Sequence, residues 1–113
     1  KYIEVIFIKT KPGMATEFLK VSVEDNKPLQ QALVDAGQEL GWNLWSQVLP
    51  GGSVSDHDYF SSQFYTGFEQ MSGSGIEAAL KKAGKDGPTI LERYARSRDR
   101  VKRELLEFVV GTN

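Results

Sequence analysis

The sequence has no cysteine and only one histidine among its 113 residues. Without cysteine the chain cannot form disulfides or iron–sulfur clusters, and thiolate catalysis and Cys-ligated zinc are excluded as well. Neither sign of charge is in excess, because 14 basic and 15 acidic side chains give a net charge of −1. We therefore expect no nucleic-acid partner. Long apolar runs are also missing, so we expect neither a membrane span nor a membrane partner.

What is present is the composition of one compact domain covering residues 1–113, with 40% hydrophobic and 26% charged side chains. Four segments are rich in β-branched and aromatic residues and are predicted to be strands: 2–10, 42–49, 59–66 and 101–110. The connection between the second and third segments is short and polar. We therefore expect these two strands to form an antiparallel hairpin.

Two helical regions separate the strands. After the first strand, apolar residues recur every three to four positions, and Pro28 lies inside that pattern. Because proline disrupts a helix and disfavours helical geometry in the residue before it, we predict two helices, over residues 14–25 and 27–37, with Asp25 or Asn26 capping the second. The other helical region, between the third and fourth strands, is interrupted by glycine and serine. The order β-α-β-β-α-β predicts an α+β fold with a four-stranded antiparallel sheet and helices on one face.

Both faces of this sheet are predicted to be apolar. Ile3, Val5 and Phe7 share one side of the first strand, and Ile6 and Ile8 share the other. A bare face of this kind would be a large exposed apolar patch. We therefore expect a second copy of the chain to cover it, which gives a homodimer.

Four stretches carry a resemblance to a known group of proteins: the opening strand followed by KPGM, the segment KPLQQALVDAG leading to GWNLWSQVLPGG, the strand HDYFSSQFYTGF, and the closing run SRDRVKRELLEFV. In layout the chain resembles the dimeric α/β-barrel superfamily, in which two ferredoxin-like subunits pack sheet to sheet. Within it the chain is similar to antibiotic-biosynthesis-monooxygenase-like and uncharacterised members. None of the stretches is a diagnostic catalytic motif, so the resemblance implies an architecture and leaves the activity open.

Strand alternation gives a candidate ligand site. We expect Trp42, Leu44, Phe60 and Phe64 to face the helices, which need large apolar partners. The residues alternating with them would face the space between two sheets: Asn43, Trp45, Gln47, Tyr59, Ser61, Gln63 and Tyr65. Aromatic walls with a few amides and hydroxyls suit a small apolar or aromatic ligand, and a wet dimer interface has the same composition. A bulge near Gly52 or Gly67 would invert one strand relative to the other.

His57 is the first suspect for acid–base chemistry or haem ligation. It lies between Asp56 and Asp58 after a Gly/Ser loop, a setting typical of a solvated strand entry. Haem-degrading relatives use an Asn, a Trp and a His, as the resemblance implies, and Asn43 and Trp45 offer two of these on a single strand. We expect no haem and no other cofactor. A metal site is not expected either, because there is no second histidine.

The stretch from Glu92 to Glu104 contains six cations and three anions and is the only basic patch. Nucleic-acid binding would require exposed aromatic residues between the cations, but the one nearby aromatic residue, Tyr94, falls on the apolar helical face. A helix-to-strand junction with salt bridges is the favoured interpretation.

The sequence contains no readable arrangement of nucleophile and base or of paired carboxylates. The preferred interpretation is a small-ligand-binding homodimer with an amphipathic aromatic cavity. The first alternative is a cofactor-independent monooxygenase-like or isomerase-like enzyme acting on an aromatic or polyketide substrate, a chemistry that needs mainly a dry cavity and polar groups. The second is a purely structural or regulatory dimer.

The chain starts at Lys1, without an initiator methionine and directly before a strand. We expect that it has been trimmed, either by removal of a signal peptide, which implies export to the periplasm, or by shortening of a cytoplasmic chain.

Overall fold

The computed structural model describes residues 1–49 and 55–112. Its centre is one sheet with strand order β2-β3-β1-β4, in which each neighbouring pair is antiparallel. The strands are β1 (Tyr2–Thr10), β2 (Gly41–Ser46), β3 (Tyr59–Tyr65) and β4 (Arg98–Glu107). The helical elements are α1 (Ala15–Val21), the π-helical segment η1 (Ser22–Asn26), α2 (Lys27–Asp35), the short 3-10 helix η2 (Phe68–Ser72), α3 (Ile76–Ala83) and α4 (Gly87–Ser97).

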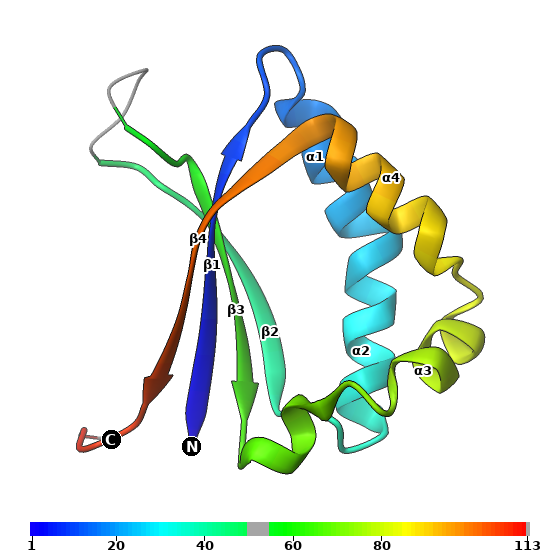
Figure 1. Ribbon diagram of the computed structural model, residues 1–113, viewed down its shortest axis with the longest axis vertical. Helices are drawn as coiled ribbons and strands as arrows, with labels where there is room; N and C mark the ends of the chain where they lie inside the picture. The colour runs from blue at the N-terminus through cyan, green and yellow to red at the C-terminus, as the bar shows by residue number, and fades with distance from the viewer. Residues whose placement is uncertain (50–54, 113) are drawn as a thin grey trace.

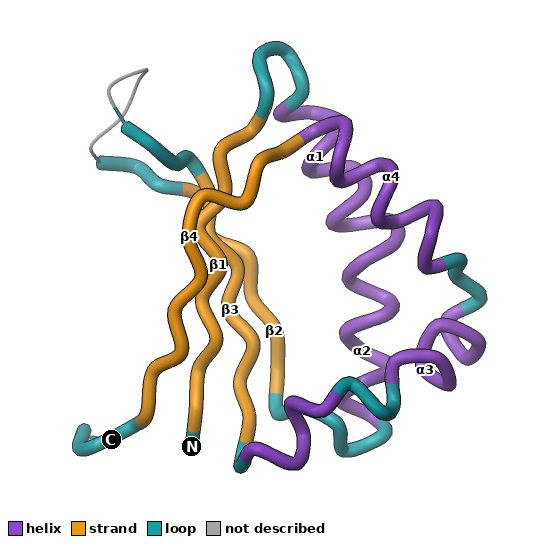
Figure 2. The backbone as a smooth tube through the Cα atoms, viewed as in Figure 1, coloured by secondary structure: helices purple, strands orange, loops and turns teal. Residues whose placement is uncertain are grey.

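The long helices all lie on one side of the sheet (Figure 1). Figure 2 shows the same two layers, with strands in orange and helices in purple. Strand order and one-sided cover are those of the ferredoxin-like α+β fold, so the predicted fold class is confirmed. The position near Gly52, where a bulge was considered, lies outside the described residues.

The helical segment between β1 and β2 is continuous, although the sequence predicted a break before Pro28. Asn26 has helical dihedral angles (φ −76°, ψ −40°), and its side chain does not cap α2. The expectation that Asp25 or Asn26 caps a separate helix is therefore wrong. In a regular helix the proline ring would clash with the carbonyl group four residues earlier, and proline has no N–H to donate. The π-helical spacing of η1 widens the turn before Pro28 and lets the helix continue.

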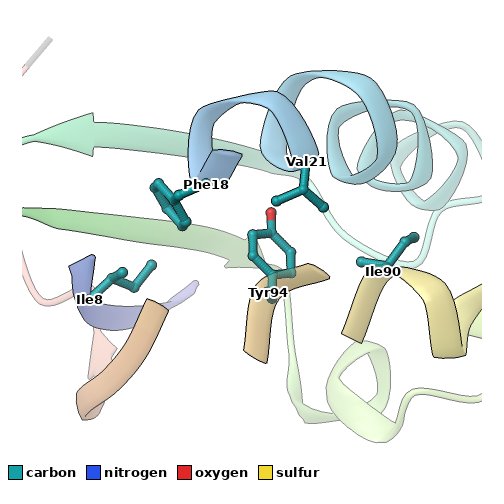
Figure 3. Close-up of a cluster of buried hydrophobic side chains, with 5 residues drawn as sticks. All are labelled: Ile8, Phe18, Val21, Ile90 and Tyr94. Atoms are coloured by element: carbon teal, nitrogen blue, oxygen red, sulfur yellow. The ribbon is translucent and has the colours of Figure 1, made fainter. Parts of the chain in front are cut away.

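An apolar cluster joins the sheet to α1 and α4. It consists of Ile8, Phe18, Val21, Ile90 and Tyr94 (Figure 3). The Tyr94 hydroxyl is satisfied inside the protein because it lies 3.0 Å from the hydroxyl of Ser22, which in turn donates to the Phe18 carbonyl oxygen. This cluster identifies the face of the sheet that the helices cover, since Ile8 belongs to it.

Strand pairing shows which other side chains share the helix-covered face with Ile8. Ile8 pairs with Tyr59, Glu4 pairs with Gln63, and Tyr2 pairs with Tyr65. Paired residues point to the same side of a sheet, and every second residue along a strand does so too. The tyrosines and Gln63 of β3 therefore face the helices, whereas the sequence interpretation placed them on the opposite side.

The opposite side, which we call the outer face, carries the phenylalanines of β3. Phe60 pairs with Phe7 on β1 and with Trp45 on β2, and Phe64 pairs with Ile3. The prediction that Phe60 and Phe64 face the helices is wrong. Trp45 points away from the helices as predicted, but its neighbours there are phenylalanines and not the tyrosines of β3.

The outer face carries a broad apolar patch across β2, β3 and β1 that reaches β4, beside the polar side chains of Asn43, Ser62, Lys102 and Glu104. Its apolar members are Ile3, Val5, Phe7, Trp45, Phe60, Phe64 and Leu106. Trp45 is 51% exposed and Leu106 is 48% exposed, and the rings of Trp45 and Phe60 stack with their centroids 6.1 Å apart. The described residues leave this face without a covering layer (Figure 1).

Candidate ligand site beneath the helices

The helix-covered face changes from apolar to polar along the strands. At one end Ile8 belongs to the apolar cluster. Toward the other end, Gln63 of β3 pairs with Glu4 on one side and with Trp42 on the other. A carboxylate and an amide placed under a helical layer cost free energy unless they are hydrogen-bonded or serve a ligand. This end of the covered face is therefore the place to look for a site.

A cavity of about 200 Å³ lies at this end. We call it the Glu39 cavity, and the residues that define it are Glu4, Leu33, Glu39, Gln63, Tyr65, Met71, Ile76 and Arg103. A neighbouring hollow of about 190 Å³ also borders on Gln63 and is lined by Asn26, Gln30 and Trp42. A larger open groove of about 560 Å³ runs between α2 and β2, but the one ionisable residue that lines it, Lys27, is exposed.

Glu39 reaches the cavity because of the way in which α2 ends. Gly37 adopts a left-handed conformation with φ 72°, and its N–H donates to the Val34 carbonyl oxygen, while the N–H of Gln38 donates to that of Leu33. This pair of hydrogen bonds is the Schellman motif, which ends a helix and reverses the chain. The N–H of Leu40 then donates to the Phe64 carbonyl oxygen at 2.7 Å, which holds the loop against β3.

The carboxyl group of Glu39 is held by amides and not by cations. Glu39 is only 3% exposed, and its Oε2 accepts a hydrogen bond of 3.1 Å from Gln63 Nε2. Among the described residues, no lysine or arginine forms an ion pair with it. Burial without a compensating charge raises the pKa of Glu39 to about 7, although the hydrogen bond from Gln63 opposes that rise. Both its acid and its base form are thus populated near neutral pH.

Gln30 on α2 meets the other oxygen of Glu39 and can serve both protonation states. One terminal atom of its amide lies 2.7 Å from Glu39 Oε1. If this atom is the amide nitrogen, it donates to an ionised carboxylate. If it is the amide oxygen, it accepts the proton of a neutral carboxyl group, and Gln30 Nε2 then donates to Asn26 Oδ1 at 3.0 Å. In this second orientation Gln30 Oε1 also accepts a hydrogen bond of 3.0 Å from Gln63 Nε2.

Tyr65 and the Glu4–Arg103 pair form the opposite side of the cavity. Tyr65 is buried, and within residues 1–49 and 55–112 its hydroxyl has no hydrogen-bond partner. Burial, followed by the negative charges of Glu4 and Glu39, raises the pKa of Tyr65 to about 12, so the hydroxyl keeps its proton and is available as a donor. Glu4 Oε2 accepts hydrogen bonds from Arg103 Nη2 at 2.6 Å and from Arg103 Nε at 3.1 Å. Glu4 is thus paired with a cation, unlike Glu39.

The predicted site residues do not form one group. Gln63 and Tyr65 line the Glu39 cavity. Tyr59 faces the same layer but packs on Phe18, with ring centroids 5.0 Å apart. Trp45 is on the outer face, where its Nε1 donates to Ser62 Oγ at 3.3 Å.

Three further members of the predicted set lie elsewhere. Asn43 pairs with Ser62, which places it on the outer face, and Ser61 pairs with Ile6 on the helix-covered face. Gln47 follows β2, and its Nε2 donates to Ser55 Oγ at 2.9 Å. Because one strand was assigned to the wrong face, the predicted common surface does not exist. Whether any single member binds a ligand stays a prediction.

Sequence patterns do not identify Glu39, Gln30 and Glu4 as site residues. The one local signal for Glu39 is Gly37, which can end a helix and turn the next residues inward. In the sequence, Gln30 and Glu4 are ordinary polar residues of a helix and a strand. The sequence does not show which side of that helix or that strand is packed in the interior.

His57 and the basic stretch have structural partners. His57 Nδ1 lies 2.6 Å from Asp56 Oδ1, and its ring packs edge-on against Phe7. Arg93 of the basic stretch contacts Glu17 and Asp25, which agrees with the predicted salt bridges. Over the described part of the chain there is no group of three or more acidic or histidine side chains that could hold a metal ion, and no helix long and apolar enough to cross a membrane.

The fold and the cavity define a small ferredoxin-like α+β protein with a polar pocket between its two layers. No family model matches the sequence, and no curated protein matches it either. The structure is similar to the crystal structure of HapK from Hahella chejuensis, with a TM-score of 0.66 and 10% sequence identity. The match covers 100% of this chain and 97% of HapK. At this level of identity the likeness shows the fold alone.

Proposed function

We propose that the protein is a homodimer that binds one small aromatic or polar-aromatic molecule in the Glu39 cavity of each subunit. One observation carries this proposal. The sheet face that the helices cover is polar around a cavity, while the face without cover carries a patch of large apolar side chains. A self-sufficient monomer would rarely leave such a patch without cover.

The dimer is supported by the outer face. Monomeric proteins rarely expose a contiguous patch of several large apolar side chains, and the same patch on a second copy is the simplest complement under a twofold axis. Sheet-to-sheet packing of two ferredoxin-like subunits is also what the resemblance to the dimeric α/β-barrel superfamily implies.

The ligand is expected to be small. Pockets for drug-sized molecules have volumes of roughly 300–1,000 Å³, and the Glu39 cavity has about 200 Å³. Leu33, Met71 and Ile76 offer apolar contact, while Gln63 and Tyr65 offer hydrogen-bond donors. A molecule with one or two rings and at least one oxygen atom matches this lining.

A second candidate function is catalysis without a cofactor, of the isomerase-like or monooxygenase-like kind. The observation that favours it is Glu39, a buried carboxyl group that lines the cavity and titrates near neutral pH. A purely structural or regulatory dimer is the outcome that remains if the cavity binds nothing.

Titration calorimetry with 2-naphthol, a two-ring phenol, tests the binding function. We expect saturable binding that is about fivefold weaker in Tyr65→Phe, because a lost hydrogen bond is worth about 1 kcal/mol. Tyr59→Phe is the matched control, since this tyrosine faces the same layer but packs on Phe18 outside the cavity, and we expect it to leave the affinity unchanged. Absence of binding up to the solubility limit, or equal losses in the two variants, would contradict the proposal.

A further inference from the structure

We infer that Glu39 is a catalytic residue, a general base that removes a proton from a carbon atom next to a carbonyl group, while the Tyr65 hydroxyl donates a hydrogen bond to that carbonyl oxygen. The substrate class is an enolisable ketone with one or two rings. This inference rests on the proposed function, because the substrate must occupy the Glu39 cavity.

The position of Glu39 suits a base. Its carboxyl group lines the cavity and is almost fully buried, so water competes little for the proton. Amides of Gln63 and Gln30 hold both oxygens in place. Neither amide carries a charge, and an uncompensated buried carboxylate binds a proton more readily than one paired with a cation.

The second carboxyl group of the cavity, Glu4, does not meet this requirement. Arg103 donates two hydrogen bonds to Glu4 Oε2, at 2.6 and 3.1 Å. Glu4 is therefore already paired with a cation, whereas Glu39 has no cationic partner among the described residues. His57, the other group considered for acid–base work, lies beside Phe7 on the outer face of the sheet.

Tyr65 offers a hydrogen-bond donor to the carbonyl oxygen of the substrate. Tyr65 lines the same cavity, and its hydroxyl has no hydrogen-bond partner in the described part of the chain. When a proton leaves the carbon, negative charge collects on the carbonyl oxygen, and a fixed donor placed there stabilises the enolate more than the ketone. Because Tyr65 keeps its proton to about pH 12, it acts as a hydrogen-bond donor and not as a second base.

The step balances without a co-reactant. The Glu39 carboxylate takes the α-proton, the C–H bond breaks, and its electron pair forms a C=C bond while the carbonyl π electrons move to oxygen. The neutral Glu39 then returns the proton to the same carbon, to oxygen or to another carbon of the conjugated system. Carbon is neither oxidised nor reduced overall, so the reaction class is tautomerisation or isomerisation.

Deuterium exchange into 2-tetralone, a two-ring ketone, measures this step directly. In D₂O, proton NMR follows the loss of the α-proton signal, and the rate in buffer alone is subtracted. We expect the wild-type protein to accelerate the exchange and Glu39→Gln to reduce the acceleration at least 100-fold, within the range that general-base catalysis contributes. Glu77→Gln, at an exposed position in the first turn of α3, is the matched control and should retain the full rate.

The pH profile separates a base from a merely structural carboxylate. The exchange rate should rise tenfold per pH unit below about pH 7 and level off above it, as Glu39 becomes ionised. The other ionisable groups that line the cavity are Tyr65, Glu4 and Arg103, and the pKa of Tyr65, about 12, lies far above this range.

Calorimetry with 2-naphthol, which resembles the enol of 2-tetralone, is run on the same samples. If both proteins bind 2-naphthol but the wild type does not accelerate exchange, or Glu39→Gln accelerates it equally, the inference about Glu39 is wrong while the binding function stands. If neither protein binds 2-naphthol and no exchange occurs, the binding function itself has failed.

Discussion

Phe60→Lys is expected to convert the proposed dimer to monomers. Phe60 lies near the middle of the outer face, with its ring centroid 6.1 Å from that of Trp45 and 6.1 Å from that of Phe7. A lysine there would place an unpaired ammonium group in an apolar interface, and a buried charge without a partner costs several kcal/mol. We expect the dimer dissociation constant to rise at least 100-fold, which sedimentation velocity at micromolar concentrations measures.

Val23→Lys is the control for this experiment. Val23 is also an exposed apolar residue, at 62%, but it lies on η1 on the helical side of the molecule. This variant should remain dimeric. A wild-type protein that sediments as a monomer at micromolar concentration, or a Phe60→Lys protein that stays dimeric, would refute the assignment of the outer face as the interface.

Glu39→Gln is expected to stabilise the protein by about 3 kcal/mol at pH 8 and to change its stability little at pH 4. The folded protein holds Glu39 with a pKa of about 7, against 4.5 for the unperturbed group. Between these values the folded state binds more protons than the unfolded state, so wild-type stability falls as the pH rises from about 4.5 to about 7. Each pKa unit corresponds to about 1.4 kcal/mol. Glutamine preserves the shape of the side chain and does not titrate.

Urea denaturation of both proteins at pH 4 and pH 8, at equal protein concentration, measures this difference. Tyr65, Glu4 and Arg103 line the same cavity and are present in both proteins, so their contributions cancel to first order. Glu77→Gln again serves as the exposed control, with little change expected at either pH. A stability difference that is the same at pH 4 and pH 8 would show that Glu39 is not an uncompensated buried carboxyl group. In the exchange experiment the same variant is expected to lose activity. Replacing a catalytic group that is held in unfavourable surroundings often lowers activity and raises stability in this way.

Local sequence patterns were sufficient to predict the order of the strands and helical regions of this fold. The strand of residues 2–10 was predicted at its observed bounds. Its run of β-branched and aromatic residues is followed closely by Pro12 and Gly13, which mark its end. The closing strand was expected over 101–110 and is found at Arg98–Glu107. The break predicted at Pro28 is wrong, because the prediction rested on the tendency of proline to end helices. A π-helical turn before Pro28 lets the helix continue.

The face of β3 could not be obtained in the same way. In the β2–β3 hairpin an even-numbered residue pairs with an odd-numbered one, as Trp42 does with Gln63. This parity depends on the conformation of the connection, which composition does not reveal. The assumption that the largest apolar side chains lie under the helices then selected the wrong parity, since Phe60 and Phe64 face outward.

The candidate site depends on that parity and on tertiary packing. Gln63 and Tyr65 were named from the sequence, but their surroundings were expected to include Trp45, which lies on the other side of the sheet. Glu39 could not be identified, because a carboxylate between a helix and a strand is ordinarily exposed. Only the approach of α2 and β3 shows that it is buried between Gln30 and Gln63.

The two tryptophans offer the most direct test of the claim that the ligand site lies beneath the helices. Trp42 pairs with Gln63 on the helix-covered face, and Trp45 pairs with Phe60 on the outer face. Their indole N–H groups give two separate signals in a ¹⁵N–¹H correlation spectrum, and 2-naphthol can be titrated while both are observed. We predict that the Trp42 signal shifts with the binding curve and that the Trp45 signal stays in place. A shift of Trp45 with Trp42 unmoved would place the ligand on the outer face and contradict the account.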